Sequence, residues 1–200
     1  MVQGSAVPGV NEMDLRDVAG SLPAVHSTSR HDPSLMSQTL LRIVSSVDLG
    51  RLETLDFQAR DGGYEGAELG TVGRVEVTAI RWPTGSTLSL RGQPDSPSLF
   101  RVVHGVIVQY RFDPTPPGYR FRRIPRVART SSQLLLGGFH FLEALEPSLT
   151  VHAHVVSDDP GDSSVPPEEL PKLRDAFHRD IAEIPGAIPP HLLAMLSGAR

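Results

Sequence analysis

The run FHFLEALEPSLTVHAHVV, Phe139 to Val156, contains two strand-like segments rich in β-branched and aromatic residues. Side chains along a β-strand point to alternate faces. Thr150, His152 and His154 therefore share one face of the second segment, and the residues between them on the other face are all apolar. We expect the polar face to line the interior of a barrel. The apolar face would then be buried against a helix or a partner subunit.

Further runs of the same type occur upstream and are separated by breaks that contain Gly or Pro, such as DGG, WPTG, GQPDSP and DPTPPG. Many short strands at such spacing are typical of an all-β sandwich or barrel. The sequence thus predicts a mainly β fold. The runs are LETLDFQAR (52–60), RVEVTAIRW (74–82), LFRVVHGVIVQYRF (99–112) and QLLLGGFHFLEAL (133–145).

Helices are expected on both sides of this β region. Apolar residues recur at near-helical spacing in Ser34 to Val47, a shorter candidate spans Met13 to Leu22, and a final one starts at Leu170. We divide the chain into a disordered N-terminus (1–12), a helical segment (13–50), the barrel (51–157), and a Pro-rich linker with a C-terminal helix and tail (158–200).

Composition narrows the class of protein. Two hundred residues suit one domain, and a net charge of −4 gives no basic excess for nucleic acid. No apolar run is long enough for a membrane span, and the N-terminus lacks the pattern of a secretory signal. Cysteine is absent, which excludes disulfides and thiolate ligands. We expect a cytoplasmic protein that binds neither nucleic acid nor membrane.

Four short motifs follow one another in the order found in a known family. They are Trp82-Pro83-Thr84-Gly85, Val102-Val103-His104-Gly105, Gly138-Phe139-His140 and Thr150-Val151-His152-Ala153-His154. Over about residues 34–157 this series resembles the cysteine dioxygenase family of cupins. The resemblance implies a jelly-roll-like cupin β-barrel with helical additions at both ends. It also implies an iron ion held by three histidines, of which His140 would be the third.

Two features that the family requires are missing. Its other two iron ligands, a His-x-His pair, should fall at Leu90-Arg91-Gly92, and no histidine lies between His31 and His104. Its substrate-binding arginine follows a tyrosine by two residues, which here gives Gly66 after Tyr64. The resemblance therefore implies a degraded iron site in which Tyr64 remains as a substrate-binding residue.

Three functions stay open. The leading one is a pocket lined by His140, Thr150, His152 and His154 that binds a small molecule or supports an active partner. The second is a thiol dioxygenase-like oxidoreductase with a metal site rebuilt from the three histidines, since imidazoles suit iron and other transition metals. The third is a metal-free isomerase, cyclase or hydrolase that uses these histidines as acid and base. We expect no cofactor unless the new histidine site exists. The sequence also leaves a homodimer or heterodimer open.

Five arginines cluster in GYRFRRIPRVAR, residues 118–129. Such a cluster either binds an anion or an acidic partner, or protects a solvated strand edge from pairing. Because the chain as a whole is negatively charged, the second interpretation is favoured.

Overall fold

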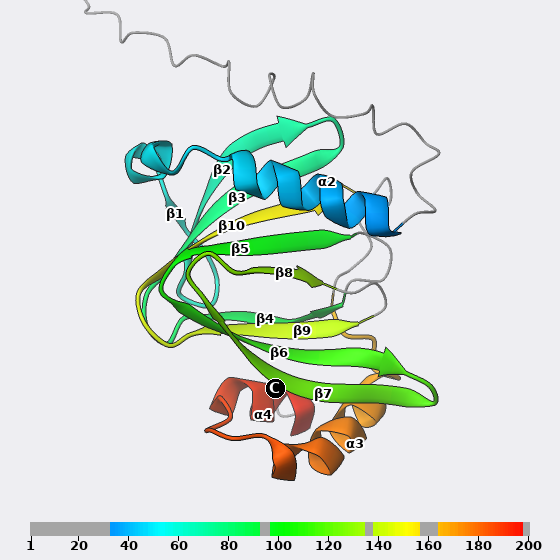
Figure 1. Cartoon of the computed structure of the whole chain (residues 1–200). Helices are drawn as coiled ribbons and strands as arrows, with labels where there is room; N and C mark the ends of the chain where they lie inside the picture. Colours follow the sequence, from blue (N-terminus) through cyan, green and yellow to red (C-terminus); the bar gives the residue numbers. More distant parts are fainter. Residues whose placement is uncertain (1–32, 93–96, 135–137, 157–163, 198–200) are drawn as a thin grey trace, which may run out of the picture.

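The computed structural model describes residues 33–92, 97–134, 138–156 and 164–197, and shows two β-sheets flanked by helices (Figure 1). The expected helix at Met13 to Leu22 and the expected disordered N-terminus lie outside the described residues. None of the helices in the described part of the chain is long and apolar enough to cross a membrane.

Each sheet is antiparallel. Sheet A contains, in spatial order, β1 (Gln58–Ala59), β2 (Glu65–Val72), β3 (Val75–Trp82), β10 (Ser148–Val155), β5 (Ser98–His104) and β8 (Ser131–Leu134). Sheet B contains β4 (Thr87–Gly92), β9 (Phe139–Ala144), β6 (Val106–Thr115) and β7 (Gly118–Val127).

The strand order identifies the architecture. From β3 to β10 the chain alternates between the sheets except at the β6–β7 hairpin, which lies within sheet B. Sheet A thus has the order 3-10-5-8 and sheet B the order 4-9-6-7. Eight strands arranged in this way form a jelly roll, the double-sheet architecture that cupins and several other families use. The prediction of a mainly β, jelly-roll-like barrel with helices at both ends is confirmed.

Helix α2 (Pro33–Ser46) covers the outer face of sheet A (Figure 1). Its apolar residues recur every three or four positions, so Leu40, Ile43 and Val44 all face the sheet and are fully buried. They pack against residues of β10 and its neighbours that include Val151 and Ala153. The apolar face of β10 is thus buried against a helix, as the alternation predicts.

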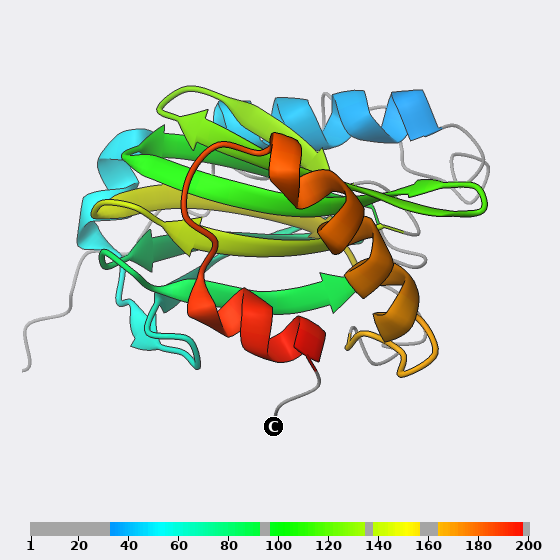
Figure 2. The ribbon, with the colours of Figure 1, turned by 90° about the horizontal axis from the view of Figure 1, so that it is seen from below.

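Two C-terminal helices cover the outer face of sheet B (Figure 2). They are α3 (Leu170–Asp180) and α4 (Pro190–Ser197), and short 3-10 turns lie at Ile181–Glu183 and, before the barrel, at Leu49–Thr54. Leu173, Phe177 and Leu192 pack onto aromatic residues of the sheet. The sequence predicts only the first of these helices, because prolines punctuate the segment that contains α4.

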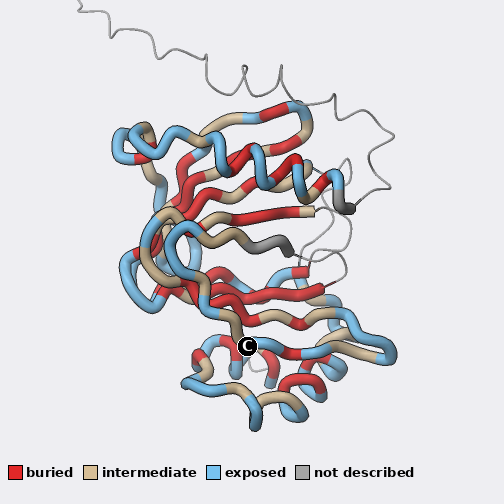
Figure 3. The backbone as a smooth tube through the Cα atoms, in the orientation of Figure 1, coloured by how far each residue is buried: buried red, intermediate tan, exposed pale blue. Residues whose placement is uncertain are grey.

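Between the sheets lies a third apolar cluster, formed by the residues that point into the barrel. It includes Trp82, Phe100, Val102, Ile107 and Leu142, all fully buried. Figure 3 shows the buried residues concentrated in the strands and in the helix faces that meet them. The part of the barrel interior around these residues is therefore filled by packed side chains.

The run LETLDFQAR does not form the strand that the sequence predicts. Leu49–Thr54 is a 3-10 helix capped by the Asp48 carboxylate, which accepts a hydrogen bond from the Gly50 N–H at 2.9 Å. Only Gln58 and Ala59 pair with another strand. The side-chain cap thus stabilises a helical turn where the sequence has β propensity. The paired strands therefore start later than residue 51.

Candidate functional site

The barrel interior changes from apolar at one end to polar at the other. The apolar end holds Trp82 and Ile107, whereas the polar end holds His140, His152 and several arginines. Several side chains at the polar end reach solvent, because Arg91 is exposed and the side chains of Arg122 and His154 are 49% and 44% accessible. We refer to this part of the interior as the polar mouth.

A chain of hydrogen bonds fixes His152 at the polar mouth. The Trp82 indole N–H donates to Thr150 Oγ1 at 2.8 Å, and Thr150 Oγ1 lies 2.9 Å from His152 Nε2. Because Thr150 accepts from the indole, its own hydroxyl proton is available to donate to Nε2. That arrangement assigns the remaining proton of His152 to Nδ1. The imidazole also stacks on Phe100, with ring centroids 5.3 Å apart.

His152 is held in its neutral form. Burial lowers its pKa to about 3, and the nearby His140 and His154 add to the effect. Protonation would place a charge among Phe100, Trp82 and other imidazoles, where water cannot solvate it well. At neutral pH this side chain is therefore a polar but uncharged group.

His140 lies on β9 in sheet B, which faces the sheet that carries His152, and is 4% exposed. It stands directly opposite Arg91 of β4 on one side and Arg111 of β6 on the other. Burial lowers its pKa to about 3, and the two guanidinium charges contribute to the shift. Among the described residues no hydrogen-bond partner of the His140 ring is found. The imidazole is thus a buried polar group whose bonding capacity is unused by the described residues.

Three more charged side chains extend the polar mouth across sheet B. The Arg111 Nε and Nη2 atoms donate to Asp113 Oδ1 at 2.9 and 2.6 Å, and Arg122 Nε lies 3.6 Å from Asp113 Oδ2. Arg126 donates to the amide oxygen of the buried Gln109 at 3.3 Å. Burial lowers the pKa of Arg126, and so does the charge of Arg111. Positive groups therefore crowd this face.

The remaining predicted site residues lie at the margins. The His154 Nε2 atom is 3.1 Å from the Glu76 carboxylate, and both side chains are half exposed at the rim. Tyr64 packs against Trp82, with ring centroids 5.2 Å apart and the planes tilted by 31°. No ring contact of Tyr64 with either inner histidine is found in the described part of the chain.

The described residues do not fit the iron that the resemblance implies. Leu90 is buried against the C-terminal helices, and Gly92 has no ligating side chain. His140 is flanked by two guanidinium groups, which would repel a metal cation. No group of three His, Asp or Glu side chains that could hold a metal ion is found among residues 33–92, 97–134, 138–156 and 164–197. In particular, His140, His152 and His154 do not form the rebuilt site that the sequence leaves open.

Of the residues selected from the sequence, the structure places Thr150, His152 and His140 together at the polar mouth. It adds Arg91 and Arg111, which sequence reasoning missed, and Arg122 from the arginine cluster. The signal for Arg111 was present in β6, where Gln109, Arg111 and Asp113 alternate with apolar residues. In the cluster of residues 118–129, β7 is indeed an edge strand. Within this edge strand, Arg122 and Arg126 also interact with the inner-face residues Asp113 and Gln109 of β6.

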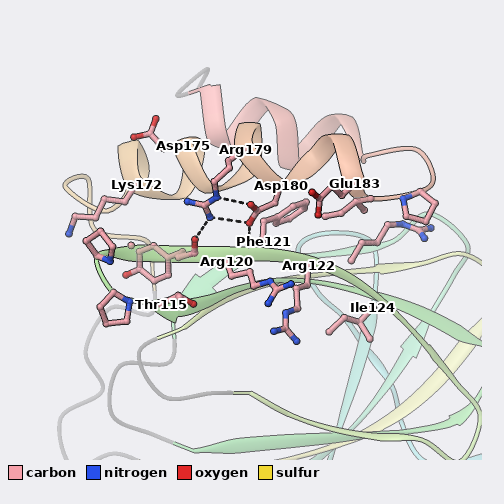
Figure 4. Close-up of a pocket in the computed structure, with 17 residues that line it drawn as sticks. Thr115, Arg120, Phe121, Arg122, Ile124, Lys172, Asp175, Arg179, Asp180 and Glu183 are labelled. Atoms are coloured by element: carbon pink, nitrogen blue, oxygen red, sulfur yellow. Dashed lines mark hydrogen bonds and ion pairs between the residues drawn. The ribbon is translucent and has the colours of Figure 1, made fainter.

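A second concave region lies outside the barrel, between β7 and α3 (Figure 4). It has a volume of about 1120 Å³ and is lined by charged residues that include Lys172, Asp175 and Glu183. Within it, Asp180 accepts hydrogen bonds from Arg179 and from the Phe121 N–H. The bond from Phe121, together with one that Arg179 donates to the Tyr119 carbonyl, ties α3 to β7, which is a structural role.

No model of a known protein family matches this chain, and no curated protein matches it. Solved structures with a similar fold include KdgF from Halomonas sp., at 14% identity and a TM-score of 0.46, covering 54% of this chain and 91% of that one. A predicted oxalate decarboxylase from Thermotoga maritima has 13% identity and a TM-score of 0.45, covering 52% of this chain and 96% of that one. The cupin domain of Schizosaccharomyces pombe Cnp3 has 11% identity and a TM-score of 0.44, covering 53% of this chain and 72% of that one. Because these identities and TM-scores are low, the fold assignment rests on the strand order and not on the similarity to these structures.

Proposed function

We propose that this protein binds a small molecule at the polar mouth of the barrel, between His140 and His152, without a metal ion. The observation that carries the proposal is the buried His140 ring, for which no described residue serves as a hydrogen-bond partner. The ring nitrogens are therefore available to hydrogen-bond a ligand, and the exposed Arg91 beside the ring lies next to solvent.

His152 would supply the second contact. Its ring is fixed by Thr150 on one edge and by Phe100 on one face, so its orientation does not have to be selected on binding. Fixed side chains lose little conformational entropy when a ligand arrives. The resemblance to cysteine dioxygenases then extends to the barrel and to the Thr-x-His strand, and does not extend to the iron.

The Trp82–Thr150–His152 chain favours one further candidate, a metal-free acid–base enzyme. A general base must be oriented by a neighbouring group and neutral at the working pH, and His152 meets both conditions. A ligand with negative charge would raise the pKa of His152 toward neutrality by direct electrostatic attraction. The candidates differ in one observable, because only the enzyme converts its ligand to product.

Binding can be tested by following the histidine ring signals in NMR spectra while adding a panel of neutral sugars, amines, carboxylates and inorganic phosphate. We expect the signals of His140 and His152 to shift, and those of the exposed His178 and His191 to stay unchanged. His152→Gln should weaken binding about tenfold or more, through the loss of a fixed hydrogen bond. His178→Ala is the matched control. Shifts confined to surface histidines, or none at all, would refute the proposed site.

Metal content gives a separate check. Protein purified without a histidine tag should contain far less than one equivalent of iron, because the described residues place no three ligands together. Elemental analysis measures this directly. Stoichiometric iron that disappears in His140→Ala would restore the thiol dioxygenase alternative.

A further inference from the structure

One cross-strand row of side chains runs over the inner face of sheet B. Arg91 stands opposite His140, His140 opposite Arg111, and Arg111 opposite Arg122. Directly opposite residues of antiparallel strands point to the same face, with Cβ atoms about 4.5–5.5 Å apart. The row therefore places three guanidinium groups and one imidazole side by side across all four strands, over roughly 14 Å.

The charges of this row are not balanced within the described part of the protein. Asp113 is the one carboxylate found bonded to it there, and it is shared by Arg111 and Arg122. Arg126, which reaches the same region, bonds to the neutral amide of Gln109. For Arg91 no ion pair is found among the described residues. Among the described residues, the three arginines of the row and Arg126 thus stand against one carboxylate, that of Asp113.

The facing sheet does not supply the missing negative charge. On this face of sheet A, Glu76 is paired with His154 at the rim, and Glu68 is exposed on β2 opposite Thr78. The other groups that face the row are the neutral His152 and the apolar Phe100. Since the Arg111 and Asp113 side chains are each only 14% exposed, solvent screens this surplus less than it screens charges on an open surface.

A surplus of partly buried positive charge is stabilised by an anion, and guanidinium groups bind carboxylates and phosphates through paired hydrogen bonds. The neutral His140 in the middle of the row can donate one more. We propose that the ligand of this barrel carries a carboxylate or phosphate group, which binds to Arg91, Arg111 and Arg122 around His140. This inference rests on the proposed function and names the chemistry of the ligand.

Titration calorimetry with malonate and with inorganic phosphate tests the inference and separates the two anion types. We expect at least one of them to bind the wild-type protein, and to bind less tightly as NaCl is added. Arg91→Gln and Arg122→Gln should each weaken binding about tenfold or more. Arg91 suits this test because its replacement breaks no ion pair found among the described residues. Arg42→Gln removes the same charge from the exposed face of α2 and should leave binding unchanged.

The outcomes can be told apart. If neutral compounds shift the His140 and His152 signals and neither anion binds, the anionic ligand is refuted while the proposed binding site stands. If an anion binds equally well to Arg91→Gln, Arg122→Gln and the wild-type protein, the assignment to this row is wrong. If neither anions nor neutral compounds affect the two histidines, the inference and the proposed function fail together.

Discussion

Replacing Trp82 by alanine should lower the free energy of unfolding by about 3–5 kcal/mol. Trp82 is the largest of the fully buried side chains, and it joins Tyr64, Phe100 and His152 at the centre of the barrel. The substitution leaves a cavity and also removes the N–H that donates to Thr150. A loss of this size is a large part of the stability of an ordinary domain, 5–15 kcal/mol. Urea denaturation followed by circular dichroism measures it.

Two companion variants separate the packing contribution from the hydrogen bond. Trp82→Phe keeps much of the apolar volume and loses the N–H donor. Its free energy of unfolding should therefore lie between those of Trp82→Ala and the wild-type protein. Leu193→Ala truncates an apolar residue that is 44% exposed and should change stability by no more than about 0.5 kcal/mol. A Trp82→Ala protein as stable as Leu193→Ala would show that the barrel interior is not packed as described.

Acidification should destabilise the fold well before its carboxylates become protonated. His140 and His152 have pKa values of about 3 in the folded protein against 6.5 for an ordinary histidine. Below pH 6.5 the unfolded chain therefore binds more protons than the folded one, so stability falls as the pH decreases. By pH 4.5 the expected loss is about 2 kcal/mol for each histidine. Denaturation curves at several pH values would measure this slope.

Between pH 6.5 and 4.5 the loss of stability should come from the two histidines and not from the carboxylates with lowered pKa values. Glu169 and Asp180, whose pKa values are lowered by hydrogen bonds from Lys172 and Arg179, lose their stabilising charges only below their ordinary values of 4.5 and 3.8. The double variant His140→Gln, His152→Gln should flatten the profile in this interval. An unchanged slope would mean that both imidazoles are solvated, and would also remove the basis for a buried site.

The sequence predicts which face of a strand is buried better than it predicts which strands meet. Along β10 the alternation alone places Thr150 and His152 inside and Val151 and Ala153 outside, and the structure agrees. The row of Arg91, His140 and Arg111 could not be predicted in this way. It depends on the register of three strands that are far apart in the chain, and the register is set by the packing of the whole barrel.

The two elements that the sequence analysis missed, β4 and α4, and the unusual composition of β7 have local explanations. The strand β4 is short, ends in Gly92 and follows a break rich in Gly and Pro, so little β propensity marks it. The strand β7 contains many arginines and one proline, which are tolerated because β7 lies at the edge of its sheet. Helix α4 is only eight residues long, and its stability comes from burying Leu192 and Leu196 and not from its own propensity.

The order of strands has a consequence for biosynthesis. The last two strands to be made, β9 and β10, are the ones that lie in the middle of their sheets, between β4 and β6 and between β3 and β5. Sheet B cannot pair completely until residue 144 has left the ribosome, and sheet A cannot do so until residue 155 has. At about 5–20 residues per second, the earlier strands spend several seconds without their final neighbours. Nascent chains with unpaired edges of this kind aggregate readily, so this protein should depend on chaperones during translation.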